Sequence, residues 1–204
     1  MITIVDYGMG NLRNVQRACR EIGQDAIVTS DREKVRAAEY VILPGVGAFG
    51  EAIRRIESLG LRNPILDHVE SGRPLLGICL GMQLLFDASD ESPEATGLGL
   101  IKGTVRRLSG DVKIPHIGWN DISPLGVSPL FPAGYPGATV YFVHSYYVEL
   151  IPETIARARY GVDISAAVRR DAVFGVQFHP EKSQHAGLEL LSQFALVNGS
   201  GGER

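Results

Sequence analysis

The sequence is short of the features that would place it in a specialised class of protein. Its 204 residues include two cysteines, one tryptophan and no apolar run near the roughly 20 residues that a membrane-spanning helix needs. Lys and Arg number 20 against 23 Asp and Glu, which gives a net charge of −3. This balance gives no reason to expect nucleic acid or an anionic membrane surface as a partner.

Two cysteines without a signal-like segment do not make a disulfide framework, so each has to be explained separately. The N-terminal stretch MITIVDYG has neither a basic start nor a long apolar segment, and we therefore expect a cytoplasmic protein. The length suits one ordinary domain with a substantial core. We expect that domain over residues 1–198, followed by a disordered tail, GSGGER, at residues 199–204.

The first half of the chain alternates short apolar runs with helical patterns. A helical pattern follows the first run, another spans Phe49 to Gly72 with a break expected near Asn63-Pro64, and a third, LGMQLLFDA, leaves Cys79. Buried strands that alternate with helices predict a parallel sheet covered on both faces, with ligands at the carboxyl ends of the strands. The predicted strands are residues 2–8, 25–30, 40–47 and 74–79.

From Thr96 to Gln177 the pattern changes to short strands and turns. These strands are expected to extend the sheet in mixed or antiparallel fashion. A final amphipathic helix is predicted over residues 184–198. The expected fold class is therefore α/β, with a mostly parallel central sheet, flanking helices and additional mixed or antiparallel strands in the second half.

One cysteine stands in a distinctive setting. The stretch Gly77–Gly81 has the form G-x-C-x-G at a predicted strand-to-helix junction, which is the thiol counterpart of the nucleophile elbow. The helix N-terminus after Cys79 would favour a thiolate and leave backbone N–H groups free for an oxyanion. A lone cysteine is more often a small packed residue, as we expect for Cys19. The strand, the helix and both glycines favour a nucleophile at Cys79.

A thiol nucleophile needs a base, and histidine is the usual one. Among five histidines, His179 ends a predicted strand in AVFGVQFHPEKS. Glu181, two residues on in an extended segment, would point the same way and set the imidazole tautomer. His-Pro-Glu by itself is as often an ordinary polar turn, but beside the elbow it becomes the most specific constellation in the chain. His68 falls on a predicted surface helix.

Zinc binding is the competing use of these residue types. Zinc deaminases combine His-x-Glu with a downstream Pro-Cys-x-x-Cys, which this sequence lacks. The spacing of Cys79, His179 and His185 matches no recognised ligand pattern. We therefore expect no metal and no cofactor.

The stretches GICLGMQ and FHPEKS, with PGVGAFG (Pro44 to Gly50), resemble the motifs of the class I, triad-type glutamine amidotransferases, and the resemblance covers nearly the whole chain. It implies that L-glutamine is the substrate, with Cys79 as nucleophile, His179 as acid and base, and Glu181 as the orienter of His179. The implied oxyanion-hole residues are Gly45, Val46, Gly47 and Leu80, and the implied substrate-binding residues are Gln83, Glu91, His144, Ser145 and Tyr146.

Three more stretches, DYGMGNLRNV, PHIGWN and YFVHSYY, resemble the glutaminase subunits of imidazole glycerol phosphate synthases, which act in histidine biosynthesis. This resemblance implies a separate cyclase partner with a (β/α)8 barrel that receives the ammonia. We expect Trp119 in a turn that is hard to bury in one domain; the alternative is that it packs on its own core. The implied docking residues are Asn11, Asn14, Trp119 and Lys182.

Two other interpretations stay open on the sequence. The glutaminase subunit of pyridoxal phosphate synthase shares the triad but not PHIGWN or YFVHSYY. A non-catalytic relative could use Cys79 as a redox sensor, which would leave His179 and Glu181 unexplained. The glycines of the Gly45–Gly47 loop permit a peptide flip, so we also expect the isolated chain to be nearly inactive until its partner is bound.

Overall fold

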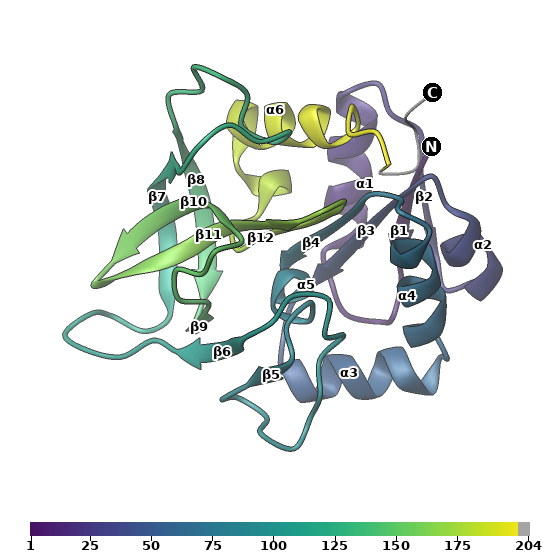
Figure 1. The fold of residues 1–204 in the computed structure, drawn as a ribbon, viewed down its shortest axis with the longest axis horizontal. Helices are drawn as coiled ribbons and strands as arrows, with labels where there is room; N and C mark the ends of the chain where they lie inside the picture. The colour runs from purple at the N-terminus through teal and green to yellow at the C-terminus, as the bar shows by residue number, and fades with distance from the viewer. Residues whose placement is uncertain (200–204) are drawn as a thin grey trace.

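The structure, a computed structural model, describes residues 1–199 of the chain. Its central feature is a nine-stranded sheet (Figure 1). The strand order is β2-β1-β3-β4-β12-β11-β10-β7-β8, and a second sheet has the order β5-β6-β9. Strands β2, β1, β3, β4 and β12 are parallel to one another, whereas β11, β10, β7 and β8 pair antiparallel. The predicted fold class is confirmed.

Most of the predicted elements form close to the expected positions. The strands are β1 (Ile2–Val5), β2 (Ala26–Thr29), β3 (Tyr40–Gly45), β4 (Leu75–Cys79), β5 (Ala88–Ser89), β6 (Thr104–Arg107), β7 (His116–Pro124), β8 (Ala138–His144), β9 (Tyr146–Tyr147), β10 (Thr154–Tyr160), β11 (Val162–Arg170) and β12 (Val173–Val176). The helices are α1 (Leu12–Glu21), α2 (Arg32–Ala37), α3 (Phe49–Ser58), α4 (Arg62–Glu70), α5 (Leu80–Gln83), the 3₁₀ helix η1 (Pro180–Lys182) and α6 (Gln184–Phe194).

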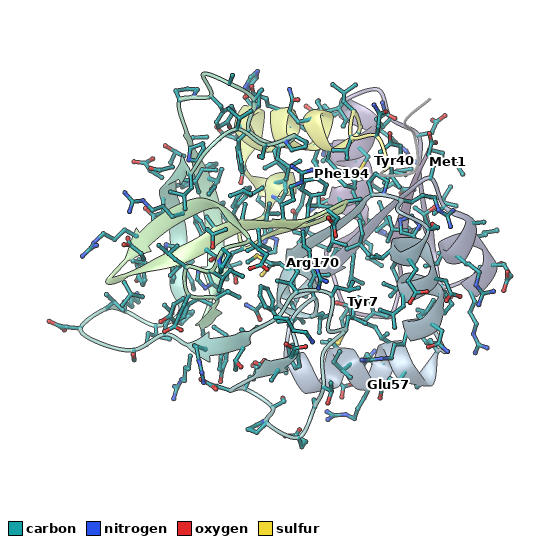
Figure 2. All side chains as sticks on the ribbon, in the orientation of Figure 1. Met1, Tyr7, Tyr40, Glu57, Arg170 and Phe194 are labelled. Carbon is teal, nitrogen blue, oxygen red and sulfur yellow. The ribbon has the colours of Figure 1, made fainter. Side chains whose placement is uncertain are left out.

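Helices cover both faces of the parallel half of the sheet, and each face has its own core. Helices α1 and α6 lie on one face, while α2, α3 and α4 lie on the other (Figure 1). Strands β1 and β4 are buried along their whole length, as a two-sided parallel sheet requires. Tyr40 of β3 meets Phe194 of α6 edge to face with ring centroids 5.8 Å apart, which fixes α6 on the sheet (Figure 2). Cys19 is fully buried in this core, as predicted.

The helical stretch from Phe49 to Gly72 breaks at a different point from the one predicted. Helix α3 ends at Ser58, Gly60 adopts a left-handed φ of +64°, and α4 begins at Arg62. Pro64 therefore sits in the first turn of α4, where the missing N–H would have had no partner in the helix. His68 on this helix is fully buried and bonds to the carbonyl of Pro74, so its predicted surface location was wrong.

The helix after the cysteine is shorter than its sequence suggested. It ends at Gln83, because the following carbonyls accept bonds from another segment: Leu98 N–H donates to Leu84 and Leu100 N–H to Leu85, both at 2.8 Å. The sequence analysis also missed α2, whose N-cap Asp31 accepts hydrogen bonds from two backbone N–H groups of the first turn.

Trp119 lies in strand β7 and not in a turn. Its strand pairs antiparallel with β8, and Trp119 is opposite Tyr141. The strand could not be recognised from the sequence because its apolar residues Ile117 and Trp119 lie on the exposed face. In a typical strand at the surface the apolar residues alternate toward the core instead. The predicted tail, apart from Gly199, falls outside the described residues. No helix within residues 1–199 has the length and apolar character to cross a bilayer.

Candidate active site

Cys79 stands at a sharp turn between β4 and α5. Its backbone has φ 56° and ψ −110°, a left-handed conformation that is uncommon outside glycine and is typical of strained functional turns. A Cβ placed on Gly77 would lie 2.6 Å from the carbonyl oxygen of Gly81, and one on Gly81 would overlap the carbonyl oxygen of Leu43. The flanking glycines are therefore required by close packing of the helix on its own strand and on β3.

The sulfur of Cys79 is almost fully buried and has two hydrogen-bonding neighbours. It lies 3.8 Å from the carbonyl oxygen of Val143 and 3.8 Å from Nε2 of Gln177. Gln177 was missed by the sequence analysis, although it is a buried polar residue directly after an apolar strand. That contrast is the signal that could have found it, because a buried carboxamide has to be paired.

His179 and Glu181 form a buried pair just after β12. Nδ1 of His179 lies 2.8 Å from Oε1 of Glu181, and each side chain is 1% exposed. The geometry differs from the predicted extended segment, because Pro180 starts the 3₁₀ helix η1 and this turn brings Glu181 back to the ring. A carboxylate accepts only, so Nδ1 carries the proton and Nε2 is left for chemistry.

The environment of His179 makes its imidazole a ready proton carrier. Burial by itself lowers the pKa of His179, but hydrogen bonding to Cys79 and Glu181, together with the charges of both, raises that pKa to about 9. Within residues 1–199 no hydrogen bond of good geometry engages Nε2, so Nε2 is left available for proton transfer beside the charge of Cys79. The imidazolium is stabilised as long as Cys79 carries negative charge.

The predicted oxyanion loop lies against the elbow. Gly45, the last residue of β3, is in parallel register with Cys79, and its Cα approaches the start of α5 so closely that a Cβ there would lie 2.9 Å from Gly81 N. Val46 is partly exposed, and Gly47 has a φ of +101° that favours glycine. Leu80 follows Cys79 at the start of α5.

Hydrogen bonds hold this loop at both ends. The buried hydroxyl of Tyr7 donates to the carbonyl oxygen of Pro44 at 2.8 Å, directly before the loop. Directly after it, the backbone N–H of Phe49 donates to Oε2 of Glu91 at 2.7 Å. Glu91 is thus engaged as a cap of α3 as well as facing the cavity described next. Tyr7 was not predicted as a site residue.

A cavity of about 430 Å³ opens between these elements. A larger hollow of about 680 Å³, near Gly99 and Arg170 at the opposite ends of β4 and β12, contains neither nucleophile nor imidazole and lies away from the chemistry. The smaller cavity brings together the candidate catalytic cysteine and histidine with residues from the oxyanion and substrate predictions. Its lining comprises Val46, Gly47, Cys79, Leu80, Gln83, Glu91, Pro115, Val143, His144, Ser145, Tyr146, His179 and Lys182.

His144 reaches this cavity with both ring nitrogens already engaged. Nδ1 lies 2.9 Å from the carbonyl oxygen of Tyr146, and Nε2 lies 2.9 Å from Nδ1 of His116. Burial lowers the pKa of His144 to about 3 and that of His116 to about 4, so both rings are neutral at pH 7. Nδ1 of each ring must carry the proton, and His144 therefore orders the segment after β8. The predicted substrate contact of His144 stays a prediction.

The predicted docking residues come from three elements, α1, β7 and η1. Trp119 is 48% exposed and packs edge to face on Tyr141, with ring centroids 5.9 Å apart. Nζ of Lys182 lies 5.7 Å from the centre of the Tyr141 ring, and Lys182 also lines the cavity. Asn11 is the N-cap of α1, and Asn14 on that helix lines a small groove beside Glu181. Within residues 1–199, no group of three or more His, Cys, Asp or Glu side chains is placed to hold a metal ion.

Comparison with known proteins identifies the fold and the family of this chain. Residues 3–197 match the family described as glutamine amidotransferase class-I. Among solved structures, one titled crystal structure of glutamine amidotransferase superposes with a TM-score of 0.76 at 21% identity, covering 96% of this chain and all of that one. The structure of PurLQS from Thermotoga maritima gives a TM-score of 0.72 at 22% identity over 95% and 96% of the two chains.

Relatives of similar sequence identify the subgroup of this family to which the chain belongs. The imidazole glycerol phosphate synthase subunit HisH of Syntrophotalea carbinolica is 49% identical over 95% of this chain and 98% of its own length. The HisH subunit of Methanothermobacter thermautotrophicus is 48% identical over 97% and 98%. The chain thus belongs to the class-I glutamine amidotransferases and, within them, to the HisH subunits of imidazole glycerol phosphate synthase. The pyridoxal phosphate synthase alternative is thereby set aside.

Proposed function

We propose that this chain hydrolyses L-glutamine to glutamate and ammonia with Cys79, His179 and Glu181, and passes the ammonia to a separate cyclase subunit that makes imidazole glycerol phosphate in histidine biosynthesis. The observation that carries this proposal is the buried His179–Glu181 pair, whose imidazole lines the same cavity as Cys79. The chemistry needs neither metal nor cofactor, because an amide can be cleaved by a thiol with a matched acid and base.

Acylation begins with transfer of the thiol proton of Cys79 to Nε2 of His179. The sulfur then attacks the side-chain carbonyl carbon of glutamine, and the negative charge moves to the carbonyl oxygen. Backbone N–H groups of Leu80 and of the Gly45–Gly47 loop are the proposed donors to this oxyanion, and each such donor is worth about 3–4 kcal/mol. Nε2–H of His179 protonates the amide nitrogen, the C–N bond breaks and ammonia leaves a γ-glutamyl thioester on Cys79.

Deacylation uses the same imidazole as a base. Once Cys79 is acylated it carries no charge, so a contribution that raised the pKa of His179 is absent, and the ring, which has given its proton to ammonia, stays neutral. Neutral Nε2 takes a proton from water as the oxygen attacks the thioester carbonyl. The C–S bond breaks, glutamate leaves and the thiolate–imidazolium pair of Cys79 and His179 is restored. Glu181 keeps the ring oriented through both steps.

The ammonia acceptor is proposed to lie on the partner. Residues 3–197 are accounted for by the amidotransferase match. The proposed partner is a (β/α)8 barrel docking on Asn11, Asn14, Trp119 and Lys182. Exposed Ile117 and Trp119 on β7 support this, since an aromatic and an aliphatic side chain at the surface of one strand suit a protein interface. The cytoplasmic location and the domain limits 1–198 remain predictions.

Replacement of Cys79 by serine tests the proposal. In the complex with the cyclase, Cys79→Ser should abolish glutamine-dependent synthesis, because the serine hydroxyl is a far weaker nucleophile beside this imidazole. Synthesis from added ammonium salt should continue at the wild-type rate. Loss of both activities would show that Cys79 supports folding or docking instead. Retention of glutamine-dependent synthesis would exclude Cys79 as the nucleophile.

A further inference from the structure

Two buried carboxamides connect the Cys79 sulfur to the backbone that follows β8. Nε2 of Gln83 lies 3.0 Å from the carbonyl oxygen of Tyr146 and 3.0 Å from Oε1 of Gln177. Nε2 of Gln177 lies 3.8 Å from the Cys79 sulfur, within reach for a sulfur acceptor. Gln177 is fully buried and Gln83 is 5% exposed. Burying a side-chain amide costs free energy unless its polar atoms are paired. Two adjacent buried amides beside a candidate nucleophile therefore suggest a role beyond filling the core.

The network determines which end of each amide faces its neighbour. The carbonyl of Tyr146 can only accept, so the atom of Gln83 beside it must be the NH₂ nitrogen. The same nitrogen has a second proton, which it donates to Gln177, so the atom of Gln177 there is the oxygen. The remaining end of Gln177, the one facing the sulfur, is therefore an N–H donor. Amide orientations that are otherwise ambiguous are fixed by these bonds.

The Tyr146 carbonyl is itself held in place. It also accepts the Nδ1 proton of His144, whose other nitrogen is bonded to His116. Two neutral imidazoles thus anchor the acceptor from which the orientation of Gln83 and then Gln177 follows. A flipped Gln177 would place its NH₂ group against the NH₂ group of Gln83, two donors with no acceptor between them, and its oxygen against the sulfur.

The N–H donor of Gln177 can stabilise the Cys79 sulfur when the sulfur is charged. As a thiol, Cys79 can donate to the carbonyl of Val143, 3.8 Å away. After its proton has moved to His179, the same carbonyl oxygen faces a negatively charged sulfur and repels it. The N–H of Gln177 then becomes a charge-assisted donor to the thiolate. The same donor stabilises the thiolate again when it leaves the thioester.

We propose that Gln177 is a catalytic residue that stabilises the Cys79 thiolate through its Nε2–H, and that Gln83 positions Gln177 for this task. The proposal rests on the proposed function, because it gives Gln177 a role only if Cys79 is the nucleophile. This role differs from a packing role in one respect: the N–H donor of Gln177 stabilises the negative charge on the sulfur, whereas a packing residue would only fill space in the core.

Gln177→Glu is the sharpest variant, because it keeps the length of the side chain and the oxygen that accepts from Gln83. It replaces only the donor that faces the sulfur. In the complex with the cyclase at pH 7.5, kcat for glutamine hydrolysis should fall about tenfold to hundredfold, with KM changed less than about threefold. Alkylation of Cys79 by iodoacetamide, followed by mass spectrometry of the labelled peptide, should slow by at least about tenfold.

The pH dependence separates a donor from a packing role. The ratio of Gln177→Glu to wild-type alkylation rates should rise as the pH falls, because a protonated Glu can again donate to sulfur and no longer repels it. Gln177→Met, which has neither donor nor charge, should slow hydrolysis about tenfold with no such trend. It also carries the test if the Glu variant does not fold, with thermal unfolding as the check.

Gln16→Glu is the matched control, since Gln16 also donates through Nε2 to a backbone carbonyl, Ala26 O at 2.8 Å, away from the cavity. It should leave hydrolysis and alkylation unchanged. Folded Gln177 variants with hydrolysis and alkylation within twofold of wild type would overturn the proposal. Failure of the proposed function would look different: Cys79→Ser would retain glutamine-dependent synthesis whatever residue stands at 177.

Discussion

The hydroxyl of Tyr7 donates a 2.8 Å hydrogen bond to the carbonyl oxygen of Pro44, which fixes the peptide directly before the Gly45–Gly47 loop. Burial, and next the negative charge of Cys79, raises the pKa of this phenol well above its ordinary value, so the hydroxyl remains a donor. The bond thus ties the first strand to the loop that is proposed to hold the oxyanion. Three elements, β1, β3 and the elbow, meet at this point.

Tyr7→Phe should therefore impair catalysis more than folding. We expect kcat for glutamine hydrolysis in the complex to fall about tenfold and the free energy of unfolding to fall by about 1–2 kcal/mol. Tyr40→Phe is the control, because Tyr40 also donates to a backbone carbonyl, Val197 O at 3.0 Å, away from the cavity. Its stability should drop similarly with full activity retained. Equal turnover in the two variants would contradict a role for Tyr7 in positioning the loop.

Gly81→Ala should destabilise the whole domain. Its Cβ would overlap the carbonyl oxygen of Leu43, which belongs to a buried strand and has little room to move. We expect a loss of about 3 kcal/mol in the free energy of unfolding, measured by urea denaturation. Gly23→Ala meets no neighbour but has a φ of +75°, so it should lose only about 1 kcal/mol. Similar losses in both variants would show that the turn at Cys79 can rearrange to accommodate a Cβ at position 81.

Acid should weaken the fold through the two neutral imidazoles of His116 and His144. Burial lowers their pKa values to about 4 and about 3 in the folded chain, so between pH 6.5 and 4 the unfolded state binds more protons. Their contribution to stability is complete above pH 6.5 and is lost as the pH falls through that window. The pKa of His179, raised to about 9, acts in the opposite sense: its contribution is lost as the pH rises through 9.

Denaturation midpoints between pH 8 and pH 4 would measure this effect. His116→Phe removes one titrating ring from between Phe142 and Tyr160, on which His116 stacks with centroids 4.8 Å and 3.9 Å away. The variant should therefore lose less stability than the wild type on acidification. His185→Gln, at an exposed position of α6, should leave the acid slope unchanged. If the pH dependence of stability is the same in His116→Phe as in the wild type, protonation of the His116 ring does not contribute to acid destabilisation.

Trp119→Ala should weaken docking of the cyclase partner. A partly exposed aromatic at the centre of an interface is worth about 2 kcal/mol or more, so the Kd should rise at least about thirtyfold in titration calorimetry. Val127→Ala removes another exposed apolar side chain, 76% exposed and outside strand β7, and should leave the Kd unchanged. If both variants bind as tightly as the wild type, the docking face lies elsewhere.

The sequence alone was enough for the local chemistry. The G-x-C-x-G spacing predicted the elbow because only glycine tolerates the close packing on either side of Cys79. The proline after His179 predicted the end of a strand, and the alternation of apolar runs with helical patterns predicted the parallel half of the sheet. These are features that near neighbours in the chain determine.

Only the tertiary structure decided what lies opposite these residues. Gln177 and Tyr7 contribute through bonds to Cys79 and Pro44, residues distant in sequence. The apolar strand before Gln177 marks that residue as unusual, but it does not identify the sulfur as its partner. The strand that carries Trp119 was not predicted because its outer face is apolar. Helix α5 ends at Gln83 because the carbonyls of Leu84 and Leu85 accept hydrogen bonds from Leu98 and Leu100. Short-range preference fixes where a turn or strand can form, whereas pairing across the sheet determines which buried polar groups meet at the sulfur.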